Sequence, residues 1–130
     1  MVNIDTHSRL KYFLWILTLH SFFTGIFLTI LPAKFLIFFG FPEYPHTFFQ
    51  IQGGVFHIVM SVAYLMASMN IEKSKHLIYF IIITKFIATF FLFSYFLLIV
   101  SIWMLLLSAI GDGIMAIGVL ILYKQYLRGK

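Results

Sequence analysis

The sequence contains no cysteine, and only 10% of its residues are charged. The absence of cysteine excludes disulfides, thiolate metal sites and a cysteine nucleophile. The scarcity of charge is more informative, because about 25% of the residues of a soluble domain are normally charged. With 62% hydrophobic residues, too few polar side chains remain to cover a surface in water. The 130-residue chain is therefore predicted to form a single domain that has lipid as its solvent.

Proline is also scarce, and all three prolines fall in one stretch between the first two apolar runs. The apolar runs do not alternate with polar residues, which argues against the strands of a membrane barrel. Their lengths approach the ~20 residues that a helix needs to cross a bilayer. The sequence predicts an all-α membrane protein, an antiparallel bundle of four transmembrane helices. The expected spans are residues 12–31, 48–69, 77–97 and 101–123, the last two joined by a tight turn without glycine or proline.

The proline-containing stretch, "PAKFLIFFGFPEYPH", is apolar but too short and too broken to span a membrane. We interpret it as an interfacial segment that lies over the mouth of the bundle. It is either a well-packed loop or a lid over a ligand. Glu43, Tyr44 and His46 near its end are interpreted as a solvated cluster rather than a metal site.

The nine Lys and Arg residues outnumber the four Asp and Glu residues, which gives a net charge of +5. The basic residues lie in short segments between apolar runs, so they indicate membrane topology rather than nucleic-acid binding. Lys34 alone falls in the connection between the first and second spans. The opposite side receives Arg9, Lys11, Lys73, Lys75, Lys124, Arg128 and Lys130. The sequence therefore predicts that both termini are cytoplasmic.

Each predicted span carries one strongly polar side chain near its middle: His20, His57, Lys85 and Asp112. At about 1.5 Å per residue, all four lie roughly 13–18 Å from the cytoplasmic ends of their helices. An ionisable group in lipid costs about 2.5–3.5 kcal/mol on insertion scales, so such groups turn inward and pair. We expect Asp112 to pair with Lys85. The pair either only fixes the register of the helices or forms part of a ligand site or proton path.

The second span carries a polar or small residue at every third or fourth position. Membrane helices turn such stripes toward other helices, where small residues allow close approach and polar groups find partners. Gly53 and Gly54 are both expected to let a neighbouring backbone come near. The stripe consists of Gln50, Gly54, His57, Ser61, Tyr64 and Ser68.

Two further chemistries, haem binding and hydrolysis by a carboxylate and a histidine, could use such residues. A bis-histidine haem needs two imidazoles on different helices at one depth, a condition that His20 and His57 meet. Lys85 and Asp112 would make such a pocket very polar, which argues against haem. Hydrolysis by a carboxylate and a histidine has less support still, because no Gly-x-Ser-x-Gly, His-Glu-x-x-His, Cys-x-x-Cys or phosphate-binding glycine loop is present. The sequence therefore assigns no catalytic residue and favours a role other than catalysis.

The stretch "QGGVFHIVMSVAYLMASMNIEKSKHLIYFIIITKFIATFFL", followed by "GDGIMAIGVLILYKQYLR", resembles the DoxX-like group of small bacterial four-helix membrane proteins. The matching features are the paired glycines 53–54, Tyr64, Lys85 and the Gly111-Asp112 pair. Related proteins often have arginine before the paired glycines, where this chain has Gln52, and this departure argues against an anionic ligand there. The resemblance implies a four-helix bundle in a bacterial inner membrane. One member of the group resembles a quinol-oxidase small subunit, but most members have no assigned activity.

We therefore expect the interior of the bundle to hold a small hydrophobic molecule with a polar head, such as a quinone or a lipid. The alternatives are a structural subunit of a larger membrane complex and an electron carrier with b-type haem. Expected partners are membrane lipid and either another protein or a second copy of the chain, but not nucleic acid. The candidate ligand-binding residues are His20, Gln50, His57, Ser61, Tyr64, Lys85 and Asp112.

Overall fold

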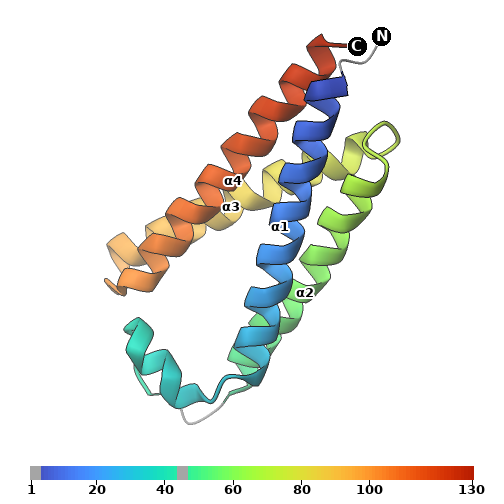
Figure 1. Cartoon of the computed structure of the whole chain (residues 1–130). Helices are drawn as coiled ribbons and strands as arrows, with labels where there is room; N and C mark the ends of the chain where they lie inside the picture. Colours follow the sequence, from blue (N-terminus) through green and yellow to red (C-terminus); the bar gives the residue numbers. More distant parts are fainter. Residues whose placement is uncertain (1–3, 44–46) are drawn as a thin grey trace.

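The computed structural model describes residues 4–43 and 47–130, and over these residues its regular elements are all helices. The four long helices are α1 (Ile4–Ile30), α2 (Phe48–Met69), α3 (Lys75–Leu98) and α4 (Trp103–Arg128). Each of them is long and apolar enough to cross a membrane. The predicted all-α, antiparallel four-helix bundle is confirmed (Figure 1).

One end of the bundle, here called the terminal end, carries both termini and the turn at residues 70–74. At this end the helices extend beyond the predicted spans. The first apolar span was expected to begin near residue 12, with Asp5 or Ser8 as the N-cap of its helix, but α1 begins at Ile4. The helix instead includes both residues, and Arg9 Nη2 lies 2.7 Å from Asp5 Oδ2 one turn earlier. α4 likewise continues past residue 123 to Arg128. Charged residues end the apolar span but not the helix, which projects beyond it.

The four helices pack as two hairpins, α1 with α2 and α3 with α4. The hairpins meet at the terminal end and diverge toward the opposite end, where η1 lies (Figure 1). The hydrophobic core is therefore concentrated toward the terminal end. It includes Leu10, Leu14 and Leu17 of α1, Ile78 and Ile81 of α3, and Val119, Tyr123 and Tyr126 of α4.

The first hairpin is held by a close approach of two glycines. A Cβ atom added to Gly25 would lie 2.6 Å from the carbonyl oxygen of Gly54, and one added to Gly54 would lie 2.8 Å from that of Gly25. Gln50 Nε2 donates to the carbonyl oxygens of Leu28 and Leu31, at 2.8 and 2.7 Å. These carbonyls lie at the end of α1, where intrahelical donors are missing. The expectation for Gly53 was wrong: nothing lies within 4 Å of a Cβ added there.

The segment after Pro32 forms a short 3₁₀ helix, η1 (Ala33–Phe39), which lies at the opening between the diverging hairpins (Figure 1). It ends at Gly40, whose φ of 88° is in the left-handed region that favours glycine. The Phe39 ring packs 6.0 Å from Phe27 of α1 and 6.1 Å from Trp103 of α4, measured between ring centroids. η1 therefore contacts both hairpins at the end where they are farthest apart.

Candidate functional site

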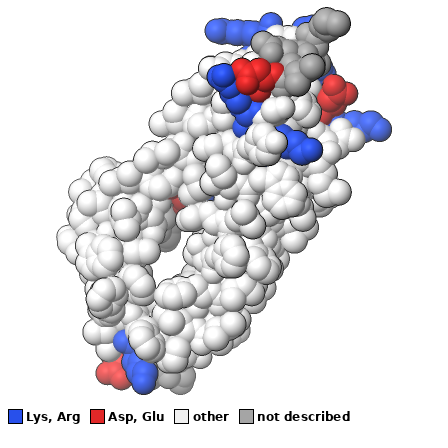
Figure 2. All heavy atoms as spheres, viewed as in Figure 1, with Lys and Arg blue, Asp and Glu red and all other residues white. Residues whose placement is uncertain are grey.

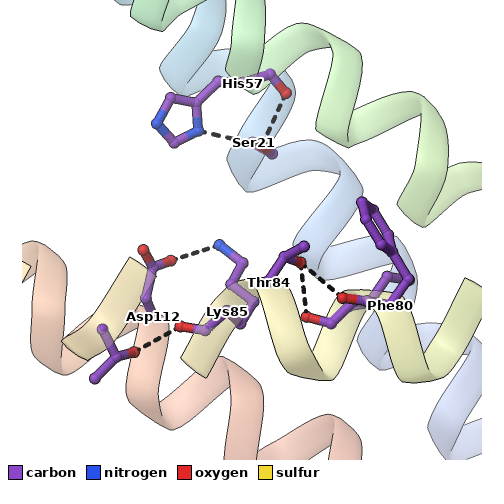
Figure 3. Close-up of polar contacts among 8 residues, drawn as sticks. Ser21, His57, Phe80, Thr84, Lys85 and Asp112 are labelled. Atoms are coloured by element: carbon purple, nitrogen blue, oxygen red, sulfur yellow. Dashed lines mark hydrogen bonds and ion pairs between the residues drawn. The ribbon is translucent and has the colours of Figure 1, made fainter. Parts of the chain in front are cut away.

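Lys85 of α3 and Asp112 of α4 form an ion pair in the middle of the second hairpin. Lys85 Nζ donates a hydrogen bond of 2.5 Å to Asp112 Oδ1 (Figure 3). The two side chains are only 6% and 13% exposed. The pairing that the sequence predicted is confirmed. Two opposite charges at this depth are tolerated because each neutralises the other.

Neighbouring polar and aromatic groups position the pair. Thr89 Oγ1 donates to the carbonyl oxygen of Lys85 at 2.8 Å, one turn along α3. Tyr64 of α2 is buried, and Lys85 Nζ lies 5.6 Å from the centre of its ring. That distance is within the range of a cation–π interaction. Tyr64 thereby brings the first hairpin into contact with an ion pair that belongs to the second.

His57 of α2 lies across an open space from the ion pair (Figure 3). Ser21 Oγ of α1 donates to the backbone carbonyl oxygen of His57 at 2.9 Å and lies 3.3 Å from Nδ1 of its ring. Among the hydrogen bonds of the described residues, none joins the His57 imidazole to Lys85 or Asp112. The Nε2 atom of His57 has no hydrogen-bond partner among the described residues.

Two cavities meet at this polar centre. The first, here called the α2/α3 cavity, has a volume of about 360 Å³ and includes His57, Tyr64, Lys85 and Asp112 in its lining. Its remaining walls, apart from Thr84, are apolar side chains of α2 and α3.

The second, here called the central cavity, has a volume of about 720 Å³ and lies between the hairpins. Phe23 and Phe27 of α1, Phe39 of η1 and Leu105 of α4 contribute to its largely apolar lining. Figure 2 shows the hollow between the hairpins on one face, with acidic atoms visible inside it. Both cavities are lined by His57, Leu92 and Asp112. The two largely apolar cavities therefore share one polar junction.

The structure brings together some of the sequence-predicted site residues and separates others. His57, Tyr64, Lys85 and Asp112 all line the α2/α3 cavity, whereas His20 lines the central cavity. Gln50 and Ser61 line neither cavity. Gln50 binds carbonyl oxygens of α1, and Ser61 Oγ donates to the carbonyl oxygen of Ile58 at 2.6 Å. Ser61 Oγ and Gln50 Nε2 thus donate to backbone carbonyls, whereas Gln50 Oε1 is buried and has no hydrogen-bond partner among the described residues.

Several cavity residues were not selected from the sequence. The aromatic wall of the central cavity, with Phe23, Phe27 and Phe39, has no distinguishing pattern because 17 phenylalanines are spread through the chain. Ser21 of α1 lines neither cavity and contributes to the site through its hydrogen bond to the backbone of His57. Within residues 4–43 and 47–130, no group of three or more His, Cys, Asp or Glu side chains could hold a metal ion. Tyr44 and His46 of the predicted solvated cluster lie outside the described residues.

The protein is a bundle of four membrane-length helices with a polar junction between two largely apolar cavities. No family model, curated protein or solved structure matches the chain.

Proposed function

We propose that the protein is a multi-pass membrane protein that binds a lipid-like or quinone-like molecule inside its helical bundle. The observation that carries this proposal is the junction of two largely apolar cavities at His57 and Asp112, with Lys85 paired to Asp112. Small-molecule sites are typically apolar, with a few polar groups that fix the orientation of the ligand. The central cavity, at about 720 Å³, is within the usual range of roughly 300–1,000 Å³.

The polar junction retains hydrogen-bonding capacity for a head group. An ammonium has three donors and a carboxylate has two acceptor oxygens. The contact between Lys85 Nζ and Asp112 Oδ1 uses one donor and one oxygen. The Nε2 atom of His57 adds a group that either donates or accepts. A head at this junction would extend its apolar tail along Phe23 and Phe27, which line the central cavity.

The proposed location is a bacterial inner membrane, with both termini in the cytoplasm. The charge distribution supports this orientation, because Lys and Arg gather at the terminal end (Figure 2). Lys34 is the one basic residue of the connection between α1 and α2. Loops rich in Lys and Arg remain on the cytoplasmic side during insertion.

We also retain the interpretation that the chain is DoxX-like, and this is the reason for placing it in a bacterium. Three residues that carry the resemblance, Tyr64, Lys85 and Asp112, line one cavity. This grouping supports a shared site but leaves the activity of that site open.

Native mass spectrometry of the protein, purified in a mild detergent, tests the proposal. The expected result is a bound compound that organic solvent extracts, at a fixed ratio to the chain. A protein without any bound compound that stays attached to a different polypeptide would instead support a structural subunit. An absorption spectrum with a Soret band would support the haem carrier. Either of these results would contradict the proposal.

A further inference from the structure

We infer that the ligand has an apolar tail and an uncharged head whose oxygen forms hydrogen bonds, as in an alcohol or a quinone. This inference rests on the proposed function, because it names the class of molecule for the same site. Three observations support it: the balance of charge at the polar junction, its unused hydrogen-bonding groups and the apolar walls of both cavities.

The charges that line the cavities cancel. Among the described residues, Lys85 and Asp112 are the only Lys, Arg, Asp or Glu residues in the lining of either cavity. They neutralise each other across 2.5 Å. His20 and His57 also face these spaces, and neutral imidazoles add no charge. A charged head would therefore bring an uncompensated charge into a medium of low dielectric constant, where such a charge is costly.

A charged head also cannot gain a partner by replacing Asp112 or Lys85 in their ion pair. A carboxylate that bound Lys85 would compete with Asp112 and leave that carboxylate buried without a counter-charge. An ammonium that bound Asp112 would do the same to Lys85. Removing one partner of a buried pair is strongly unfavourable, because the remaining charge is not compensated. An uncharged head avoids both costs and leaves the ion pair intact.

An uncharged oxygen matches the groups that remain. It can accept a hydrogen bond from the Lys85 ammonium or from a protonated Nε2 of His57, and a hydroxyl can also donate to the Asp112 carboxylate. The two sources of such a head in a membrane are quinones with their quinols, and neutral fatty alcohols or glycerides. Both present the same chemistry to this junction, so the experiment must separate them.

Four amphiphiles that each contain a linear chain of twelve carbons form the test series: dodecanol, dodecylhydroquinone, dodecanoate and dodecylammonium. Equilibrium binding of each to the purified full-length protein is measured in a bulky steroid-glycoside detergent, which lacks a linear tail. We expect dodecanol or dodecylhydroquinone to bind about tenfold or more tightly than either charged compound, given the cost of an unpaired buried charge. Equal binding of the two neutral compounds identifies the alcohol or glyceride class, and stronger binding of dodecylhydroquinone identifies the quinone class.

Single-charge variants sharpen the same experiment. Lys85→Met leaves the carboxylate of Asp112 without its counter-charge in the cavity linings, so the preference should move toward dodecylammonium by about tenfold or more. Asp112→Asn should move it toward dodecanoate by a similar factor. Lys34→Met removes an exposed lysine of η1, which lines neither cavity, and should leave the order of affinities unchanged.

The outcomes separate the inference from the proposed function. If the unmodified protein binds dodecanoate or dodecylammonium as tightly as the neutral compounds, the inference is overturned and the proposed function stands. If none of the four compounds binds saturably, both are overturned. This comparison uses the unmodified chain, so it remains decisive even if a variant fails to fold.

Discussion

Lys85 of α3 and Asp112 of α4 hold one hydrogen-bonded contact of 2.5 Å in the middle of the second hairpin. The contact joins two helices whose connecting turn has neither glycine nor proline. It also forms part of the lining of the α2/α3 cavity. A role in register and a role in binding are therefore compatible, and mutations can separate them.

The first prediction concerns the energetic coupling of this pair. Asp112→Asn leaves an ammonium without a counter-charge, and Lys85→Met leaves a carboxylate without one. Each single change should lower the free energy of unfolding by about 3–5 kcal/mol, because one buried charge loses its partner. The double variant has no unpaired charge and should recover much of that loss. Denaturant titrations of all four proteins in one detergent measure the coupling. Additive losses would show that the contact has no energetic role.

The second prediction concerns His57. Substitution by phenylalanine should displace the bound compound, because the larger apolar ring enters the space at the junction. The loss of stability should be less than about 1 kcal/mol, below the usual cost of overpacking a filled core. Ser21 would keep its hydrogen bond to the backbone carbonyl of residue 57. Extraction and native mass spectrometry report the ligand content, and denaturant titration reports the stability.

His76→Phe is the matched control for this experiment, because His76 is exposed at the beginning of α3 and lines neither cavity. It should retain the bound compound. A large loss of stability in His57→Phe with unchanged ligand content would indicate that His57 has only a structural role.

The third prediction compares two adjacent glycines of α2. A Cβ atom at Gly54 would meet Thr29 Oγ1 and the carbonyl oxygen of Gly25, whereas one at Gly53 would meet nothing within 4 Å. Gly54→Ala should destabilise the protein by about 1–3 kcal/mol, since the backbones of α1 and α2 must separate. Gly53→Ala should be neutral, or stabilising by up to about 1 kcal/mol, because alanine favours helix. Thermal unfolding of both variants measures the difference. Equal effects would contradict the close packing of the first hairpin.

The fourth prediction concerns orientation. The chain has no cysteine, so Glu43→Cys and Glu72→Cys each create a single thiol at an exposed acidic position. A reagent that cannot cross membranes should label the variant at position 43 on intact cells. It should label the variant at position 72 only after the cells are permeabilised, as the distribution of basic residues requires. The reverse pattern would place both termini outside the cytoplasm.

The sequence was sufficient to predict the helices and the ion pair for a physical reason. A long apolar run in lipid has few alternatives to a helix, because only regular structure satisfies its backbone hydrogen bonds. A buried aspartate with one lysine at similar depth has few alternative partners. The roles of Gln50 and Ser61 could not be predicted, because a polar side chain in a helix is often satisfied by backbone carbonyls nearby. Equally, a phenylalanine that faces lipid and one such as Phe23 that lines a cavity are both surrounded by apolar groups. The divergence of the hairpins, and with it the central cavity, therefore had no counterpart in the hydrophobic pattern.

That divergence makes the molecule a wedge. The hairpins meet at the terminal end and spread toward the end where η1 lies (Figure 1). A protein of this shape that spanned a bilayer would take up more area in one leaflet than in the other. A change in the spacing of the hairpins would then alter that area and the volume of the central cavity together, which would link occupancy of the site to membrane tension.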